Sequence, residues 1–270
     1  MGRVGIAATI AAALSLLGAG SALGDGIPYP SPGVPPPGTN DFSCKPPPSH
    51  PSPVVLVHGT FADMTISWNL IAPALEQQGY CVFALDYGQR ATGPIAGSAH
   101  VLKRFVDRVL QATGASRVSL VGHSQGGMMP RYYLKFLGGA GRVDDLVGLA
   151  PSNHGTTTPL APLIGPGCRA CAQQVAGSRF MTRLNAGDET PGNVSYTVIE
   201  TRNEEVVTPY ASAFLPRGPR TTNVLLQDDC PLDPAEHVSI IYDSVALQWI
   251  ENALARPGPA DASFKPTCAP

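Results

Sequence analysis

The fold of this chain is decided by the stretch Arg117-Val118-Ser119-Leu120-Val121-Gly122-His123-Ser124-Gln125-Gly126. Its first half is apolar and β-branched enough for a buried parallel strand. Residues 127–137 predict a helix with Pro130 in its first turns, where a missing N–H costs little. A strand, a sharp turn with serine between glycines, and a helix are typical of a nucleophile elbow, which exposes the hydroxyl of Ser124. The alternative is a glycine-rich loop with a passive serine.

Strand and helix patterns alternate on both sides of this elbow. The expected strands cover 54–57, 80–85, 117–121, 145–149, 195–200 and 224–226, and the expected helices cover 67–79, 95–112, 127–137 and 238–255. This alternation predicts an α/β fold with a mostly parallel, doubly wound sheet and helices on both faces. In such sheets the functional residues lie at the carboxyl ends of the strands.

Composition and the chain ends narrow the class of protein. The chain has 270 residues with 43% hydrophobic and 14% charged residues, which suits one large domain, expected at 53–270. A net charge of −2 without basic blocks speaks against a nucleic-acid partner and against a membrane surface held by charge. Residues 25–52 are rich in Pro, Ser and Gly and predict an extended arm. We expect a monomer.

The first 24 residues predict a secretory signal peptide. Arg3 is followed by the apolar run 4–17, and Ala22-Leu23-Gly24 places small residues before a cleavage site after Gly24. A membrane anchor is the alternative, but the apolar run is short, and no later segment is long and apolar enough to span a bilayer. We therefore expect a secreted protein without a transmembrane anchor.

Export changes the interpretation of the six cysteines, because an oxidising compartment favours disulfides. They are Cys44, Cys81, Cys168, Cys171, Cys230 and Cys268. In the cytosol, Cys168-x-x-Cys171 would suit a redox motif or half of a zinc site. No second Cys/His pair lies at metal-ligand spacing, so neither a metal nor another cofactor is expected.

A serine nucleophile requires a base, and only one histidine suits that role. Five lie in unsuitable places: His50 in the arm, His58 before the first tight turn, His100 on a helix, His123 in the elbow and pointing elsewhere, and His154 too early for the order serine, acid, histidine. His237 follows the last strand and opens the terminal helix. A loop there can carry it over Ser124.

The base requires a carboxylate that holds its tautomer, and the loop after strand 195–200 offers two. Glu204 and Glu205 are the candidates, with Asp228 and Asp229 as runners-up near Cys230. An acidic pair on a loop is often just solvated, so spacing alone leaves this choice open.

The third requirement is an oxyanion hole, a set of N–H donors where negative charge develops. The residue after the nucleophile, Gln125, supplies one N–H. The turn after strand 54–57 supplies the other, and Thr60 fits through its N–H, with its hydroxyl as a further donor. An ordinary glycine turn is the alternative.

These motifs together resemble the secreted bacterial lipases of the class 2 family, in the α/β-hydrolase superfamily, and more distantly fungal lipases of the B type. The resemblance runs from Cys44 to Cys268. It rests on PVVLVHGT at 53–60, GYCVFALDY at 79–87, GHSQGG at 122–127, APSNHGT at 150–156, CAQQVAGS at 171–178, EEVVTP at 204–209 and His237.

The resemblance implies roles for individual residues. Ser124 would be the nucleophile, His237 the base, and Thr60 with Gln125 the oxyanion donors. The family acid is usually Asp, and its motif falls on Glu204, one methylene longer. The resemblance also implies the disulfides Cys44–Cys81, Cys168–Cys171 and Cys230–Cys268.

The expected function is therefore a secreted carboxylic-ester hydrolase, a triacylglycerol lipase or esterase with a lipid or ester substrate. Segment 155–187 is too long for a simple connection, and we expect a small lid-like insertion or a wall of the acyl pocket. A packed crossover helix is the alternative. Two other functions remain open: an acyltransferase with the same triad, and a non-catalytic binding protein on a hydrolase fold.

Overall fold

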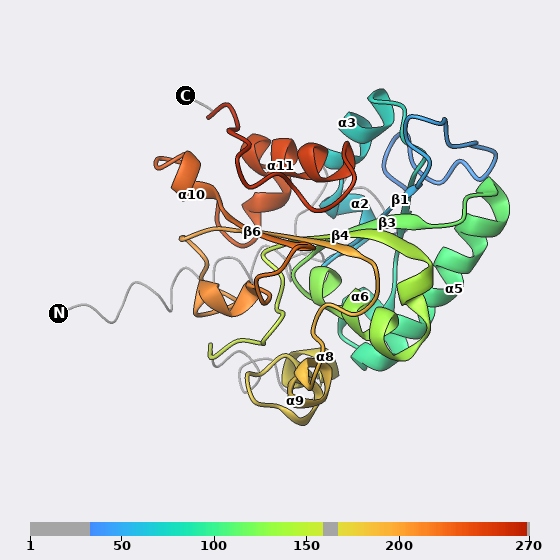
Figure 1. Cartoon of the computed structure of the whole chain (residues 1–270). Helices are drawn as coiled ribbons and strands as arrows, with labels where there is room; N and C mark the ends of the chain where they lie inside the picture. The colour runs from blue at the N-terminus through green and yellow to red at the C-terminus, as the bar shows by residue number, and fades with distance from the viewer. Residues whose placement is uncertain (1–32, 159–166, 269–270) are drawn as a thin grey trace, which may run out of the picture. The chain divides into compact units, whose positions relative to one another are not determined.

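Six strands form one parallel sheet in the computed structural model, which describes residues 33–158 and 167–268 (Figure 1). The strands are β1 Val54–Val57, β2 Val82–Leu85, β3 Val118–His123, β4 Val143–Leu149, β5 Ser195–Glu200 and β6 Thr221–Leu225. Their order is β2-β1-β3-β4-β5-β6, and every neighbouring pair is parallel. The α/β-hydrolase fold predicted from the sequence is confirmed.

The order of the strands locates the site. From β1 the chain moves outward to β2, then returns past β1 to β3 and continues away from it. The strand order therefore reverses between β1 and β3. In open α/β sheets the crevice at the carboxyl ends of such a pair is where ligands bind. Thr60 follows β1 and Ser124 follows β3, so both residues lie at this reversal.

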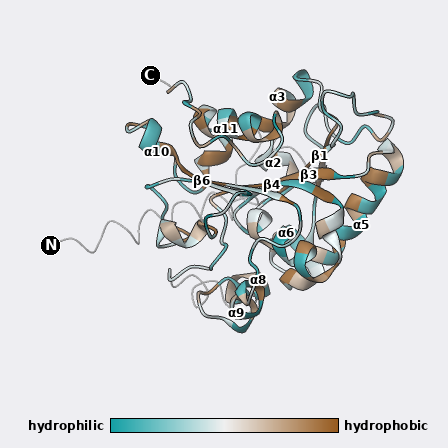
Figure 2. Ribbon diagram, in the orientation of Figure 1, coloured by the Kyte–Doolittle hydropathy of each residue, from teal (hydrophilic) through white to brown (hydrophobic). Residues whose placement is uncertain are grey.

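Helices cover both faces of the sheet. One face carries α5 Ile95–Thr113, α6 Gln125–Phe136, α8 Arg169–Gln173 and α9 Arg179–Asn185; the other carries α2 Met64–Ser67, α3 Ile71–Gln77 and α11 Ser244–Leu254. Alternate strand residues point to opposite faces, so Val55 joins the first core and Leu56 the second. Hydrophobic and hydrophilic residues share α5 and α11, as expected for helices buried on one side (Figure 2).

The helix predicted at 67–79 is wrong in its bounds. The structure has two pieces, α2 at Met64–Ser67 and α3 at Ile71–Gln77. Pro73 explains the break, because it has no N–H to donate to the carbonyl of Asn69 and a helix through Asn69 would lack that bond. The side chain of Asp63 caps α2 by accepting the N–H of Ile66 at 3.0 Å.

Other bounds differ from the predictions as well, most of them by one or two residues, and three differ in a way that has a structural reason. Helix α6 begins at Gln125 rather than at residue 127, so Pro130 lies inside the helix and not in its first turn. The terminal helix 238–255 is divided into η4 Ser239–Tyr242 and α11, because Asp243 caps α11 by accepting the N–H of Ala246 at 2.7 Å. The last strand lies earlier than predicted, at Thr221–Leu225, and α10 Leu226–Asp229 follows it directly.

The described part of the arm lies along the edge strand β2. The side chain of Asn40 accepts the N–H of Ala84 and donates to its carbonyl, each at 2.9 Å. A disulfide joins Cys44 to Cys81, one residue before β2. The arm thus covers an edge that would otherwise expose unpaired backbone groups. The predicted signal peptide at 1–24 lies outside the described residues.

Three disulfides use all six cysteines. They join Cys44 to Cys81, Cys168 to Cys171, and Cys230 to Cys268, the pairs that the family resemblance implies. The second closes the start of α8, and the third ties the C-terminal tail to the end of α10.

The segment predicted as a lid is described only in part, because residues 159–166 lie outside the described residues. From residue 167 it forms the short helices α8 and α9, whose side chains Ala170, Met181 and Leu184 belong to the core beneath α5 and α6. Within residues 33–158 and 167–268, none of the helices combines the length and apolar character needed to cross a bilayer.

Candidate active site

Ser124 occupies a strained turn between β3 and α6. Its φ is 54° and its ψ is −121°, a conformation that costs a non-glycine residue energy. Close packing around the turn requires glycines, because a Cβ on Gly122 would lie 2.0 Å from the carbonyl oxygen of Gly126, and one on Gly126 would lie 2.0 Å from that of Val57. The glycines therefore allow strand and helix to approach while the serine hydroxyl projects from the turn.

The structure brings Ser124, His237 and Glu204 together in a buried chain of contacts. The Oγ of Ser124 lies 3.1 Å from Nε2 of His237, and Nδ1 of His237 lies 2.6 Å from Oε2 of Glu204. All three residues are at most 8% exposed. The geometry assigns the tautomer: Nδ1–H donates to the carboxylate, and Nε2 is free to accept the serine proton.

The loop after β5 holds Glu204 in place. Its second oxygen, Oε1, accepts the N–H groups of Val206 at 2.6 Å and Val207 at 2.8 Å. A parallel bridge between Asn203 and Glu236 joins this loop to the loop that carries His237. The loops that carry Glu204 and His237 are therefore joined through their backbones as well as through the two side chains.

Electrostatics favours the charged form of both groups. Burial alone would raise the pKa of Glu204, but His237 and the two N–H donors outweigh burial and lower it. Burial alone would lower the pKa of His237, but the charge and hydrogen bond of Glu204 raise it above its ordinary value. The pair is thus built to stabilise an imidazolium beside a carboxylate.

The other acid candidates lie elsewhere. Asp228 forms an ion pair with Arg202, and Asp229 one with Lys265 at 2.6 Å, both at the surface. Glu205 acts on His237 through its charge and not through a hydrogen bond.

A second buried carboxyl, missed in the sequence, lies beside this pair. Glu200 ends β5 and is 0% exposed. Its Oε1 accepts the N–H of Thr201 at 2.7 Å, while its Oε2 has no partner among the described residues. Burial, together with the charge of Glu204, raises the pKa of Glu200 well above its ordinary value. Burial therefore favours the neutral, protonated form of Glu200.

His123 does not contact the hydroxyl of Ser124, but its ring lies beside His237. Its Nε2 donates to the backbone carbonyl of His237 at 2.7 Å, and the two rings are 4.9 Å apart. Burial lowers the pKa of His123 to about 3, so the ring is neutral. The elbow thus holds the base through its backbone, which no sequence signal beyond the adjacency of His123 and Ser124 indicates.

Thr60 and Gln125 lie at the reversal of strand order, as their places after β1 and β3 require. Phe61 and Ala62 direct their N–H groups to the carbonyls of Arg90 and Gly59, which leaves the N–H of Thr60 without a backbone acceptor among the described residues. The Thr60 hydroxyl donates to Oε1 of Gln125 at 2.8 Å.

A further side chain completes this group and was missed by sequence reasoning. Gln174, at the end of α8, places its Nε2 3.1 Å from the Thr60 hydroxyl and 3.0 Å from Oε1 of Gln125. Its own Oε1 accepts the hydroxyl of Ser152 at 2.8 Å. Gln174 lies in the motif CAQQVAGS and Ser152 in the motif APSNHGT. The family resemblance rests on both motifs but assigned neither residue a role.

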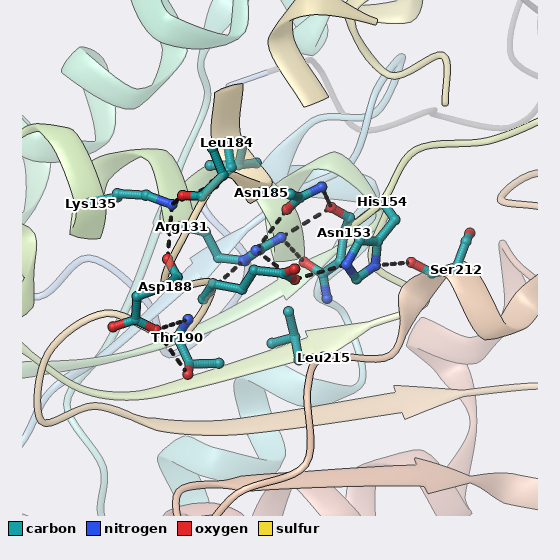
Figure 3. Close-up of polar contacts among 12 residues, drawn as sticks. Arg131, Lys135, Asn153, His154, Leu184, Asn185, Asp188, Thr190, Ser212 and Leu215 are labelled. Carbon is teal, nitrogen blue, oxygen red and sulfur yellow. Dashed lines mark hydrogen bonds and ion pairs between the residues drawn. The ribbon is translucent and has the colours of Figure 1, made fainter. Parts of the chain in front are cut away.

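The remaining histidines do not join the site. His50 stacks on Tyr80 and His58 on Tyr87. His154 belongs to a polar cluster around the buried Arg131 of α6, where its Nδ1 contacts the carbonyl of Ser212 at 2.8 Å (Figure 3). In the described part of the chain, no group of three or more His, Cys, Asp or Glu residues is arranged to hold a metal ion.

The structural likenesses concern the fold. A lipase B from Aspergillus fumigatus aligns with a TM-score of 0.70 at 23% identity, over 86% of this chain and 64% of that one. The mature lipase BlEst2 of Bacillus licheniformis aligns with a TM-score of 0.59 at 18% identity, over 83% of this chain and 96% of that one.

The sequence likenesses concern the family. Triacylglycerol lipases of Pseudarthrobacter phenanthrenivorans and Burkholderia plantarii are each 40% identical over 87 residues, 30% of this chain. These matches span only 27% and 24% of the two relatives. The model of the class 2 lipase family matches residues 51–250, which is most of the chain and contains Ser124, Glu204 and His237. This chain therefore belongs to the class 2 lipase family.

Proposed function

We propose that this chain is a secreted serine carboxylic-ester hydrolase, a triacylglycerol lipase or esterase that acts through Ser124, His237 and Glu204. The observation that carries the proposal is the continuous path from the serine hydroxyl through both ring nitrogens of His237 to the carboxylate, with contacts of 3.1 Å and 2.6 Å. Such a path activates a hydroxyl that is otherwise a weak nucleophile at neutral pH.

In the first half-reaction Oγ of Ser124 attacks the ester carbonyl while Nε2 of His237 takes the hydroxyl proton. The carbonyl oxygen becomes an oxyanion, which the N–H groups of Thr60 and Gln125 stabilise. The intermediate collapses, the C–O bond of the ester breaks, and His237 gives its proton to the leaving alcohol. Glu204 remains ionised and stabilises the imidazolium in between.

In the second half-reaction water attacks the acyl-enzyme. His237 takes one proton from the water and returns it to Ser124 as the acid leaves. The products are an alcohol, a carboxylic acid and the free enzyme. None of these steps requires a redox change, so the residues named above account for the whole reaction.

The substrate class and the compartment rest on separate observations. Family membership and the likeness to two triacylglycerol lipases support a lipid ester as substrate. Three disulfides support an oxidising compartment, in agreement with the signal peptide expected at 1–24.

Fluorophosphonate labelling tests the nucleophile. We expect a single adduct on Ser124, and Ser124→Ala should lose both the label and ester hydrolysis. The matched control is Ser119→Ala, which removes a buried serine near the opposite end of β3, where it bonds Asp145 at 2.7 Å. Residual turnover above about one thousandth of wild type in Ser124→Ala would mean that another nucleophile acts.

The pH profile tests the base. Only neutral His237 can accept the serine proton, and Glu204 raises its pKa above the ordinary value of about 6.5. Hydrolysis should therefore fall as the pH drops, with a midpoint of kcat/KM above that value. A midpoint well below it would contradict the assignment. Product analysis with added alcohol would separate hydrolysis from acyl transfer.

A further inference from the structure

Gln174 lies where it can control the oxyanion donors. Its Nε2 is 3.1 Å from the Thr60 hydroxyl and 3.0 Å from Oε1 of Gln125, and those two groups are themselves joined at 2.8 Å. The three side chains form a closed triangle. Gln174 is 8% exposed and Gln125 is fully buried, so water does not compete freely for these contacts.

The surroundings fix which end of the Gln174 amide points into the triangle. The hydroxyl of Ser152 donates to Oε1 at 2.8 Å, and the carbonyl of Ala170 accepts from Nε2 at 3.3 Å. A rotated amide would place its oxygen against Oε1 of Gln125 and against the Ala170 carbonyl, facing acceptors with no proton between them. The donating end must therefore face Thr60 and Gln125.

Within this triangle the Thr60 hydroxyl has two alternative hydrogen-bond acceptors, Oε1 of Gln125 and a substrate oxyanion. In the free protein its proton is held by Oε1 of Gln125. To donate to a substrate oxyanion, the hydroxyl must turn away from Gln125, which would leave a buried acceptor without a partner and cost free energy. Gln174 removes that cost, because its N–H already reaches Oε1 of Gln125 and stays there when the hydroxyl turns.

We propose that Gln174 is a positioning residue of the oxyanion hole: it releases the Thr60 hydroxyl for the developing oxyanion and keeps a donor on the buried Oε1 of Gln125. The proposal rests on the proposed function. It adds a third element to the site, because Gln174 comes from α8 and not from the turns after β1 and β3.

The attachment of α8 is suited to this role. The disulfide Cys168–Cys171 closes its first turn, where Sγ of Cys168 accepts the N–H of Cys171 at 3.1 Å. The N–H of Ala170 bonds the carbonyl of Thr92, and the neighbouring Gln173 accepts the N–H of Ile95 at 2.9 Å. The backbone of α8 is thus fixed to the start of α5, which fixes where Gln174 can reach.

Two substitutions test the proposal by kinetics. Gln174→Leu removes the donor at similar size, and Gln174→Glu replaces it with an acceptor. We expect each to lower kcat about 10–100-fold, with KM within about 3-fold, because the loss falls on the transition state. The affinity for an arylboronic acid, whose tetrahedral adduct places an oxygen in the oxyanion hole, should fall by the same factor as kcat/KM.

The matched control is Gln78→Leu. It makes the same substitution at a glutamine that follows α3, whose side-chain amide donates to Glu251 at 2.6 Å and contacts neither Thr60 nor Gln125. Its kcat should stay within about 3-fold of wild type. Thermal unfolding of all variants shows whether each one folds. If Gln174→Leu does not fold, Gln174→Glu alone provides the kinetic test.

A double substitution separates this role from packing. Thr60→Val removes the hydroxyl, so Gln174→Leu should cost far less in that background than in wild type if Gln174 acts through Thr60. Additive losses, an unchanged kcat in Gln174→Leu, or a rise in KM alone would each overturn the proposal. Failure of the proposed function would look different: wild type would then take up neither the fluorophosphonate nor the boronic acid.

Discussion

Two buried ionisable groups show how differently this protein treats charge. The side chain of Arg131 on α6 is 1% exposed and donates to Asn185 at 2.8 Å, to the carbonyl of Asn153 at 3.0 Å and to that of Glu189 at 3.1 Å (Figure 3). Glu200, at the end of β5, is equally buried and accepts one N–H. Arg131 has acceptors for its charge, whereas none of the described residues places a cation beside Glu200.

Burial disfavours the charged form of both groups. It lowers the pKa of Arg131 to about 10, still far above neutrality, so the guanidinium stays charged. Burial and the charge of Glu204 raise the pKa of Glu200 well above its ordinary value, which favours its neutral form. Glu204, four residues later and almost as buried, is ionised because it has His237 and two N–H donors. Partners, and not depth, decide which buried group carries charge in this protein.

The largest expected effect comes from removing the carboxylate that contacts His237, the acid of the proposed triad. Glu204→Gln should lower kcat by about 10²–10⁴-fold, because His237 loses the group that orients its ring and stabilises the imidazolium. Glu205→Gln is the matched control and should stay within a few-fold of wild type. Steady-state kinetics of ester hydrolysis measures both. Equal losses in the two variants would mean that the acid is assigned to the wrong residue.

Glu204→Asp refines this test, since the family resemblance implies an Asp at this position. The carboxylate is one methylene shorter, so activity depends on whether the loop still brings it within about 3 Å of Nδ1. Activity near wild type would mean that the loop follows the shorter side chain, and a loss comparable to that of Glu204→Gln would mean that it does not.

Removing the paired cation should cost stability. Arg131→Met leaves the carboxylate of Glu189 and several carbonyls without their buried donor, and we expect the free energy of unfolding to fall by about 3–5 kcal/mol. Denaturant unfolding measures it. Arg131→Lys, which keeps the charge without the planar set of donors, should lose less. A loss below about 1 kcal/mol for Arg131→Met would show that the cluster adds little.

Removing the neutral carboxyl should change the pH dependence of stability. The pKa of Glu200 is raised on folding, so the native state holds a proton that the unfolded state has lost above about pH 4.3. Wild type should therefore lose stability relative to Glu200→Gln as the pH rises above that value, by up to about 1.4 kcal/mol per pH unit, until Glu200 ionises in the native state. At lower pH the difference between the two should be constant. Parallel stability curves across the whole pH range would contradict a neutral Glu200.

The smallest effect should come from an ion pair at the surface. Lys103 and Asp107 are one helical turn apart on α5, 2.7 Å from each other, and each is about two-fifths exposed. Asp107→Asn should cost no more than about 0.5 kcal/mol, because water and salt screen the pair. Denaturant unfolding at low and high salt checks it. A cost near that of Arg131→Met would contradict the contrast between buried and exposed charge.

Much of the sheet could be predicted from the sequence because β1, β2 and β3 are short, fully buried and largely apolar. Strand 195–200 was predicted with its observed bounds, and 54–57 likewise. The helix bounds were less predictable, since they depend on single residues. Pro73 interrupts a helical pattern that apolar spacing alone extends back to residue 67, and Asp243 divides the terminal helix by capping its second part.

The site likewise contains residues that could be predicted from the sequence and residues that could not. Ser124 and His237 follow predicted strands, and the structure places Oγ of Ser124 3.1 Å from Nε2 of His237. The contacts of His123 with the backbone of His237, and of Gln174 with Thr60, join residues 114 positions apart in each case. Contacts at such separations arise from the packing of the sheet and α8. They could not be predicted from composition or from the spacing of neighbouring residues.

The attachment of Gln174 to a disulfide-closed helix has a consequence for protein engineering. One route to a changed acyl-chain preference would exchange the segment 155–187 as a cassette. Under the role proposed for Gln174, a cassette that matched the original in length and hydrophobicity, but lacked an amide at this position, would lower turnover as well. Chimeras should therefore be cut after Gln174, or should carry the sequence from Cys168 to Gln174 unchanged.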